Sequence, residues 1–101
     1  MVIFRFKKYG VNLGTRQLGS LVRSDLEKVL KKGEKVVLDF EGVEMVGNSF
    51  ADECLGKLLL DMSLEELEEK TTFRNLEGLS KLSVSTALRR RYNSLIVETN
   101  S

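Results

Sequence analysis

The sequence predicts a single small α/β domain in which a parallel or mixed sheet of about four strands is covered by three to four helices. The short apolar, β-branched run at residues 36–40 is typical of a strand buried on both faces. Apolar residues recur at helical spacing both before and after this run, which predicts a helix on either side of it. A chain of 101 residues suits one domain with a modest core.

The N-terminal part is predicted to form a strand and a helix. Residues 2–6 (Val-Ile-Phe-Arg-Phe) are rich in β-formers, and we expect them to pair with the strand at residues 36–40. Apolar residues at helical spacing predict a helix from Thr15, ended near Gly33. Because a strand, a crossover helix and a parallel strand connect right-handedly, residues 14–16 and 47–49 are expected to be neighbours at the sheet edge where ligands collect.

A central helix is predicted over residues 49–62. One stripe is apolar and faces the core: Phe50, Cys54, Leu55, Leu58, Leu59 and Met62. The opposite stripe is charged and is expected to face solvent: Asp52, Glu53, Lys57 and Asp61. Asn48 or Ser49 is predicted to cap the helix, and Ser49 with Asp52 approximates a capping box. Such a cap would stabilise the helix by about 1 kcal/mol without any functional role.

The C-terminal part is predicted to form a short helix, a strand and a last helix. Ser63 and Glu66 form a Ser-x-x-Glu capping box at the start of an acidic helix over residues 64–69. The segment 71–75 is predicted to be a strand at a sheet edge, and a helix follows from residue 79 to about Tyr92. We expect residues 1–92 to form the domain and residues 93–101 to be a flexible tail.

Composition argues against several classes of function. With 16 Lys and Arg against 15 Asp and Glu, the net charge of +1 gives no global attraction to nucleic acid or to an acidic membrane. The chain has no histidine, which excludes Ser-His-Asp and Cys-His nucleophiles and Cys/His zinc sites. The single cysteine, Cys54, lies on the apolar stripe and is expected to be a core residue. We therefore expect a cytoplasmic, non-enzymatic protein without metal or cofactor.

Two other groups of residues are candidate sites. Asp39 and Glu41 could hold Mg²⁺ at the sheet edge, as in a magnesium-dependent phosphohydrolase, but the favoured interpretation is that they bond to backbone in the turn. The basic run at residues 89–91 could contact nucleic acid, but a charged helix end is the favoured interpretation because no second basic patch accompanies it.

Two runs carry a resemblance to a known family: NLGTRQLGSLVRSDLEKVL at residues 12–30 and VVLDFEGVEMVGNSFADECLGKL at residues 36–58. They resemble the STAS-like domains of unknown function (DUF4325), which are relatives of the anti-sigma factor antagonist fold. In STAS antagonists an Asp-Ser-Ser-Gly-Leu pattern precedes the corresponding helix, and its second serine is phosphorylated by a partner kinase. The matching run here is GNSFA at residues 47–51, and it places Ser49 at the phosphoacceptor position.

The resemblance implies a regulatory module that binds a protein partner, such as a GHKL-type ATPase or a serine kinase. The family's similar Ser/Thr-Arg pair points to Thr15 and Arg16 as part of the site. The expected partner-binding residues are Thr15, Arg16, Gly47, Asn48, Ser49, Asp52 and Glu53. A phosphate on Ser49 would add about −1.5 to −2 charges and change the docking surface. The alternatives left open are a constitutive adaptor, in which Ser49 is never phosphorylated, and a magnesium-dependent phosphohydrolase that uses Asp39 and Glu41. For each of these functions, assembly into a homo-oligomer is also left open.

Overall fold

The structure, a computed structural model, describes residues 1–100 and the side chains of residues 1–96. Five strands, four α-helices and two short 3₁₀ helices, η1 and η2, make up this part of the chain. In chain order they are β1 (Val2–Arg5), η1 (Phe6–Tyr9), β2 (Asn12–Leu13), α1 (Arg16–Leu30), β3 (Val36–Asp39), β4 (Met45–Val46), α2 (Asn48–Cys54), η2 (Gly56–Leu60), α3 (Leu64–Lys70), β5 (Thr71–Arg74) and α4 (Gly78–Asn100).

The main sheet has three parallel strands in the order β1-β3-β5. Val36 of β3 lies opposite Val2 on one side and Thr71 on the other, and the register continues to Asp39. All four residues of the central strand β3 are buried. The predicted pairing of the first strand with residues 36–40 and the predicted edge position of the strand at residues 71–75 are thereby confirmed.

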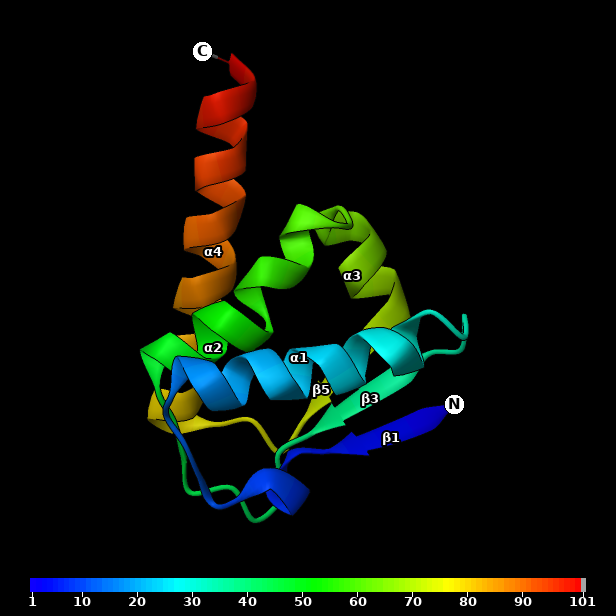
Figure 1. Cartoon of the computed structure of the whole chain (residues 1–101), viewed down its shortest axis with the longest axis vertical. Helices are drawn as coiled ribbons and strands as arrows, with labels where there is room; N and C mark the ends of the chain where they lie inside the picture. Colours follow the sequence, from blue (N-terminus) through cyan, green and yellow to red (C-terminus); the bar gives the residue numbers. More distant parts are fainter. Residues whose placement is uncertain (101) are drawn as a thin grey trace.

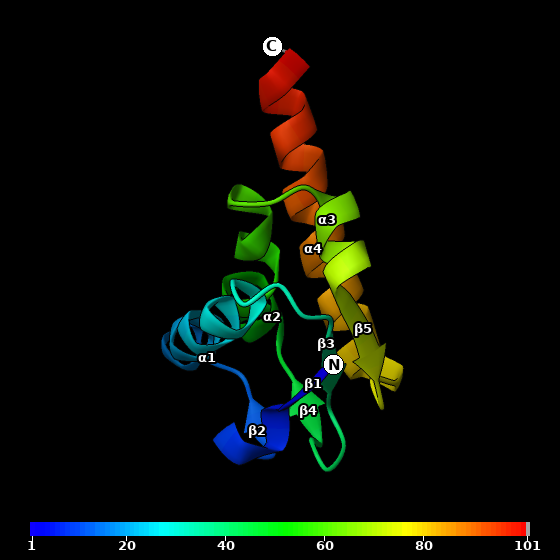
Figure 2. The same cartoon turned by 90° about the vertical axis from the view of Figure 1, so that its right-hand side faces the viewer.

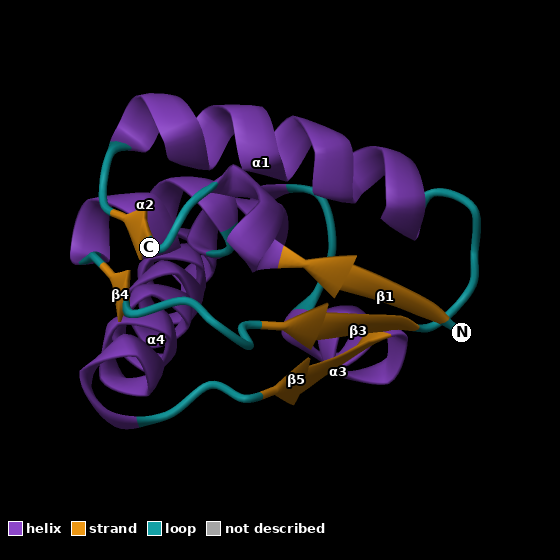
Figure 3. Cartoon of the chain, turned by 90° about the horizontal axis from the view of Figure 1, so that it is seen from below, coloured by secondary structure: helices purple, strands orange, loops and turns teal. Residues whose placement is uncertain are grey.

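The helices lie on one side of this sheet. Figure 1 shows α1 running above β1 and β3, with α2 between α1 and α4. Seen from below, the three strands lie side by side with no described helix in front of them (Figure 3). The apolar core between sheet and helices includes Phe4, Phe6, Val22, Leu26, Leu38, Phe40, Phe50, Leu55, Leu58 and Val84. The predicted single α/β architecture, with helices covering a parallel sheet, is confirmed.

A second, two-stranded parallel sheet sits below α1 and α2 (Figure 2). Its strands β2 and β4 lead almost directly into α1 and α2, respectively. Because the strands pair in register, Leu13 opposite Val46, the two helices begin side by side. The pairing of β2 with β4 therefore determines which residues lie next to each other at the starts of α1 and α2.

The predicted central helix is broken in two. The α-helical part ends at Cys54, and η2 continues from Gly56. A Cβ atom at Gly56 would lie 2.9 Å from Asp52 Oδ1 and 3.0 Å from Arg91 Cγ, so α4 packs directly against this point. The break keeps the apolar stripe in the core: its residues through Leu59 are buried and Met62 is partly buried.

The last helix is longer than predicted. The sequence places its end near Tyr92, whereas α4 continues to Asn100 and its final turns stand away from the body (Figure 1). No glycine or proline follows Tyr92 to end the helix. The domain boundary at residue 92 stays a prediction. None of the described helices is both long and apolar enough to cross a membrane.

Candidate functional site at the start of helix α2

The starts of α1 and α2 are in direct contact. The Gly47 N–H donates a hydrogen bond of 2.8 Å to the Leu13 carbonyl oxygen. A Cβ atom at Gly47 would lie 3.3 Å from the Gly14 Cα, so the two backbones pass closely there. The predicted proximity of residues 14–16 and 47–49 is confirmed, and the pairing of β2 with β4 is its cause.

The two helices are capped differently. Thr15 caps α1, and its Oγ1 accepts a hydrogen bond of 3.1 Å from the Leu18 N–H. The cap of α2 is Gly47, which makes no side-chain capping bond. The prediction that Asn48 or Ser49 caps this helix is wrong, because the helix begins one residue earlier and places both in its first turn. Both side chains are exposed there.

The hydroxyl of Ser49 is consequently open to solvent. Within the described part of the chain it has no hydrogen-bond partner, and the predicted capping box with Asp52 does not form. The carboxylate of Asp52 is held by arginines instead. A serine that is exposed, and that stabilises no helix end, can be modified at little cost to the fold.

Asp52 joins three helices. It accepts hydrogen bonds from Arg91 Nε at 2.7 Å and Arg91 Nη2 at 2.8 Å, and from Arg16 Nη1 at 2.9 Å. The bidentate geometry with Arg91 is the strong form of an arginine-carboxylate pair. Together Arg91 and Arg16 hold the pKa of Asp52 well below its ordinary value, at about 2.

Glu53, predicted to face solvent, is buried among cations. Its oxygens lie 3.0 Å from Lys57 Nζ, 3.2 Å from Arg23 Nη1 and 3.3 Å from Arg16 Nη1. Burial alone would raise the pKa of Glu53, but the three cations outweigh it and lower the pKa. The exposed face predicted for this residue is wrong, because helical periodicity does not reveal that α1 crosses α2 here.

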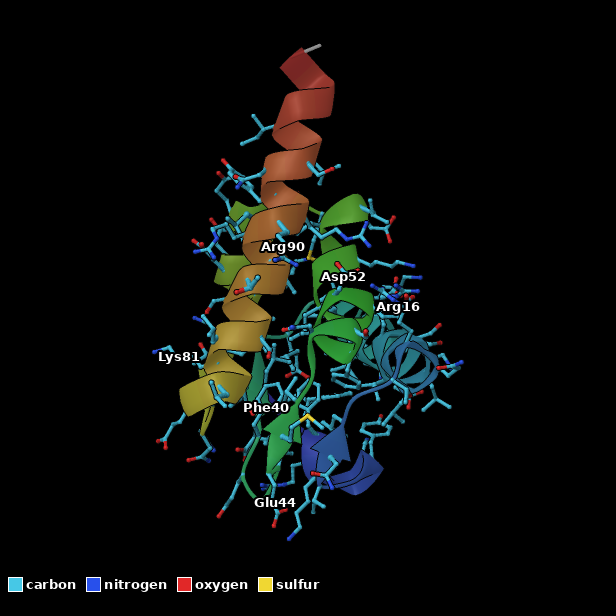
Figure 4. The ribbon with its side chains drawn as sticks, turned by 90° about the vertical axis from the view of Figure 1, so that its left-hand side faces the viewer. Arg16, Phe40, Glu44, Asp52, Lys81 and Arg90 are labelled. Atoms are coloured by element: carbon cyan, nitrogen blue, oxygen red, sulfur yellow. The ribbon has the colours of Figure 1, made fainter. Side chains whose placement is uncertain are left out.

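A polar pocket of about 300 Å³ opens between α2 and α4, beside Arg16. We call it the arginine pocket; it is lined by Arg16, Asn48, Ser49, Asp52, Ser83, Thr86, Ala87, Arg90, Arg91 and Ser94. Figure 4 shows Arg90, Asp52 and Arg16 at one level across α4, α2 and the start of α1. The basic run at residues 89–91 is visible in the sequence, but its proximity to Ser49 is not. The helical spacing of the α4 lining residues is the signal that was available.

An apolar hollow lies next to this pocket. It is lined by Met45, Val46, Gly47, Asn48, Leu79, Leu82, Ser83, Thr86 and Arg90. Three large apolar side chains are exposed in it: Leu79 is 82% exposed, Leu82 58% and Met45 43%. The hollow and the arginine pocket share Asn48, Ser83, Thr86 and Arg90. Ser49 thus lines the charged pocket, and its neighbour Asn48 also lines the apolar hollow.

Asp39 is occupied by donors of its own chain. Its Oδ1 accepts hydrogen bonds from the Glu41 N–H at 3.0 Å and Asn75 Nδ2 at 2.9 Å, and its Oδ2 lies 3.2 Å from Arg5 Nη1. Asn75 and the Glu41 N–H lower the pKa of this buried carboxyl. The predicted bond from Asp39 to turn backbone is confirmed. Across the described residues, no group of three or more potential metal ligands is present.

Cys54 is a core residue, as predicted. Its side chain is fully buried, and burial raises the pKa of the thiol to about 12. A thiol that is almost never ionised and has no access to solvent is a poor nucleophile.

Comparison with known protein families places this architecture in a class. The family described as "STAS-like domain of unknown function (DUF4325)" matches residues 19–81, and the chain belongs to this family. The match covers most of α1, every element from β3 to β5 and the beginning of α4. Searches of curated proteins and of solved structures gave no match.

Proposed function

We propose that the chain is a non-enzymatic protein-interaction module whose binding is switched by phosphorylation of Ser49. The observation that carries the proposal is the position of Ser49: its exposed side chain lines the arginine pocket, and its neighbour Asn48 lines both that pocket and the apolar hollow. STAS-like domains are generally non-catalytic, which agrees with this role. The partner is a protein, and the family resemblance favours a GHKL-type ATPase or a serine kinase.

The apolar hollow supplies the binding energy in this proposal. Exposed Leu79, Leu82 and Met45 line this hollow together with Asn48, and burying apolar side chains is the main driving force of protein association. Large exposed apolar groups rimmed by polar residues are typical of interaction sites. Asn48 and Arg16 extend the proposed surface, while Asp52 and Glu53 support it from behind through their ion pairs.

Phosphorylation would act on this surface directly. A phosphate brings about −1.5 to −2 charges to the rim of the hollow, and a partner would have to desolvate them in order to dock. The expected result is loss of partner binding without unfolding, because Ser49 makes no capping bond that the phosphate would break.

The test is phosphorylation with a defined kinase. The purified chain is incubated with ATP and a serine kinase or GHKL-type ATPase encoded next to it, and the intact mass is measured. One added phosphoryl group, absent in Ser49→Ala but retained in Ser20→Ala, supports the proposal; Ser20 is also exposed but lies on α1. Absence of the added group in the unmodified sequence would favour a constitutive adaptor.

A further inference from the structure

Helix α4 presents a row of polar groups to Ser49. The α4 residues that line the arginine pocket are Ser83, Thr86, Ala87, Arg90, Arg91 and Ser94. Their spacing of three or four residues places them on one face of the helix. Hydroxyl and guanidinium donors of this face therefore point into the same cavity that Ser49 lines from α2.

The charges around the pocket do not balance. The connected ion pairs contain four cations and three carboxylates: Arg16, Arg23, Lys57 and Arg91 against Glu27, Asp52 and Glu53. The network of ion pairs therefore has a net charge of +1, and Arg90 adds a second positive charge. Among the residues whose side chains the structure describes, Arg90 has no ion-pair partner although it lines the pocket.

We propose that the phosphoryl group of phosphorylated Ser49 is bound inside the chain's own arginine pocket, by Arg90 together with Arg16. This inference rests on the proposed function for its physiological setting. Transfer from ATP forms a bond between Ser49 Oγ and the γ-phosphorus, breaks the bond to the leaving ADP, and releases the hydroxyl proton. The resulting dianion matches the two surplus positive charges, and guanidinium groups bind phosphate oxygens in bidentate geometry.

This arrangement couples the modification to the docking surface. Arg90 lines both the arginine pocket and the apolar hollow. A phosphate that draws its guanidinium toward Ser49 removes a cation from the rim of the hollow and ties α4 to α2. The switch then works through a side chain of the docking surface as well as through the added charge.

The experiment introduces phosphoserine at position 49 during translation, so that no kinase is needed, and follows the phosphate by ³¹P NMR as the pH is varied. Phosphoserine in an unfolded chain has a second pKa of about 6. Nearby guanidinium groups favour the dianion, so we expect this pKa to be lower by about 0.5 units or more in the folded protein than in the same protein unfolded in urea.

Variants identify the cation responsible. Arg90→Gln is expected to return the second pKa of the phosphate most of the way to the urea value, whereas Arg90→Lys should retain part of the shift. Arg89→Gln is the matched control, since Arg89 is exposed in the same run but does not line the pocket. Circular dichroism establishes that each variant is folded.

An equal phosphate pKa in the folded and urea-unfolded protein, or an unchanged pKa in Arg90→Gln, would overturn the inference. Either result leaves kinase phosphorylation of Ser49 untouched, because the phosphate was placed by translation. Conversely, failure of every kinase to modify Ser49 would remove the proposed switch while the NMR shift could still be observed.

Discussion

Arg91 of α4 donates two hydrogen bonds to the carboxylate of Asp52 on α2, from Nε at 2.7 Å and from Nη2 at 2.8 Å. The pair is partly buried, and Arg16 reaches the same carboxylate from the start of α1. The carboxylate of Asp52 therefore joins α1, α2 and α4 through hydrogen bonds between residues that are distant in sequence. The proposed phosphate site lies beside this junction, so the junction fixes the positions of Ser49 and Arg90 relative to each other.

Replacing Asp52 by asparagine should destabilise the fold. The variant keeps the size of the side chain but removes the charge that two arginines share, and the pKa shift from 3.8 to about 2 corresponds to about 2 kcal/mol at neutral pH. The free energy of unfolding from urea titration measures the loss. Asp61→Asn is the control, because Asp61 is exposed and forms none of these bonds. Equal stability of Asp52→Asn and the unmodified protein would contradict the assignment.

The contribution of Asp52 should also depend on pH. Its folded pKa lies below its unfolded value of 3.8, so the stabilisation is complete above about pH 5 and is lost as the pH falls toward 2. The stability difference between the unmodified protein and Asp52→Asn is therefore expected to be constant from about pH 5 to 7 and to shrink below pH 4. Unfolding curves measured in parallel on the two proteins across this range would reveal a difference that fails to shrink.

Gly19 allows α1 and α2 to approach each other. A Cβ atom there would lie 2.9 Å from Glu53 Cβ and 3.1 Å from the Phe50 carbonyl oxygen, and neither atom can swing away. Alanine would gain about 1 kcal/mol in helix propensity, but overpacking typically costs about 1–3 kcal/mol. We expect Gly19→Ala to be destabilising on balance, measured as a lower melting temperature. In Gly14→Ala the nearest contact, 3.5 Å to Met45 Cε, is ordinary, so this control should be tolerated.

Elements with a strong local pattern could be predicted from the sequence. The strands at residues 2–6 and 36–40 are marked by β-branched and aromatic residues, α1 by its apolar period, and α3 by the Ser63 cap, which accepts the Glu66 N–H at 3.1 Å. In each case the deciding information lies within a few residues. The proximity of the starts of α1 and α2 was predicted from the handedness of the crossover, but in the structure the pairing of β2 with β4, two strands that the sequence did not reveal, is its cause.

The features that escaped prediction depend on contacts between distant segments. Glu53 occupies a charged position of the helical period, and nothing nearby in sequence indicates that Arg16 and Arg23 of α1 will cover it. The break after Cys54 lies at the point where α4 packs against Gly56. The arginine pocket likewise joins residues 48–52 to α4, more than thirty positions later, and only the folded chain brings Arg90 beside Ser49.

Cys54 should react with thiol reagents only when the protein unfolds. Burial raises the pKa of the thiol to about 12, and its side chain is fully covered. Because the chain has a single cysteine, the signal from a chromogenic disulfide reagent reports this residue alone. We expect labelling at pH 8 to be at least about a hundredfold slower in buffer than in denaturant. Rapid labelling of the folded protein would show that α2 opens readily.

Asn75 supports the buried Asp39 from a strained backbone position. Its φ is 59°, in the left-handed region, and its Nδ2 donates to Asp39 Oδ1 at 2.9 Å. Asn75→Gly loses the hydrogen bond but adopts this backbone freely, whereas Asn75→Ala loses the bond and adds strain of about 1–2 kcal/mol. Both variants should be less stable than the unmodified protein, since a buried carboxylate loses a donor worth about 1–3 kcal/mol.

The difference in stability between Asn75→Ala and Asn75→Gly separates the effect of backbone strain from the effect of the lost hydrogen bond. The backbone strain of alanine exceeds the extra unfolded-state entropy of glycine, so Asn75→Ala should be less stable than Asn75→Gly by about 0.5–1 kcal/mol. The loss of stability that both variants share should diminish as the pH falls below 3.8, because Asn75 is the main cause of the lowered pKa of Asp39. Urea titrations at pH 7 and pH 3 measure both quantities. If Asn75→Ala proved more stable than Asn75→Gly, the left-handed backbone conformation at residue 75 would not be what disfavours alanine there.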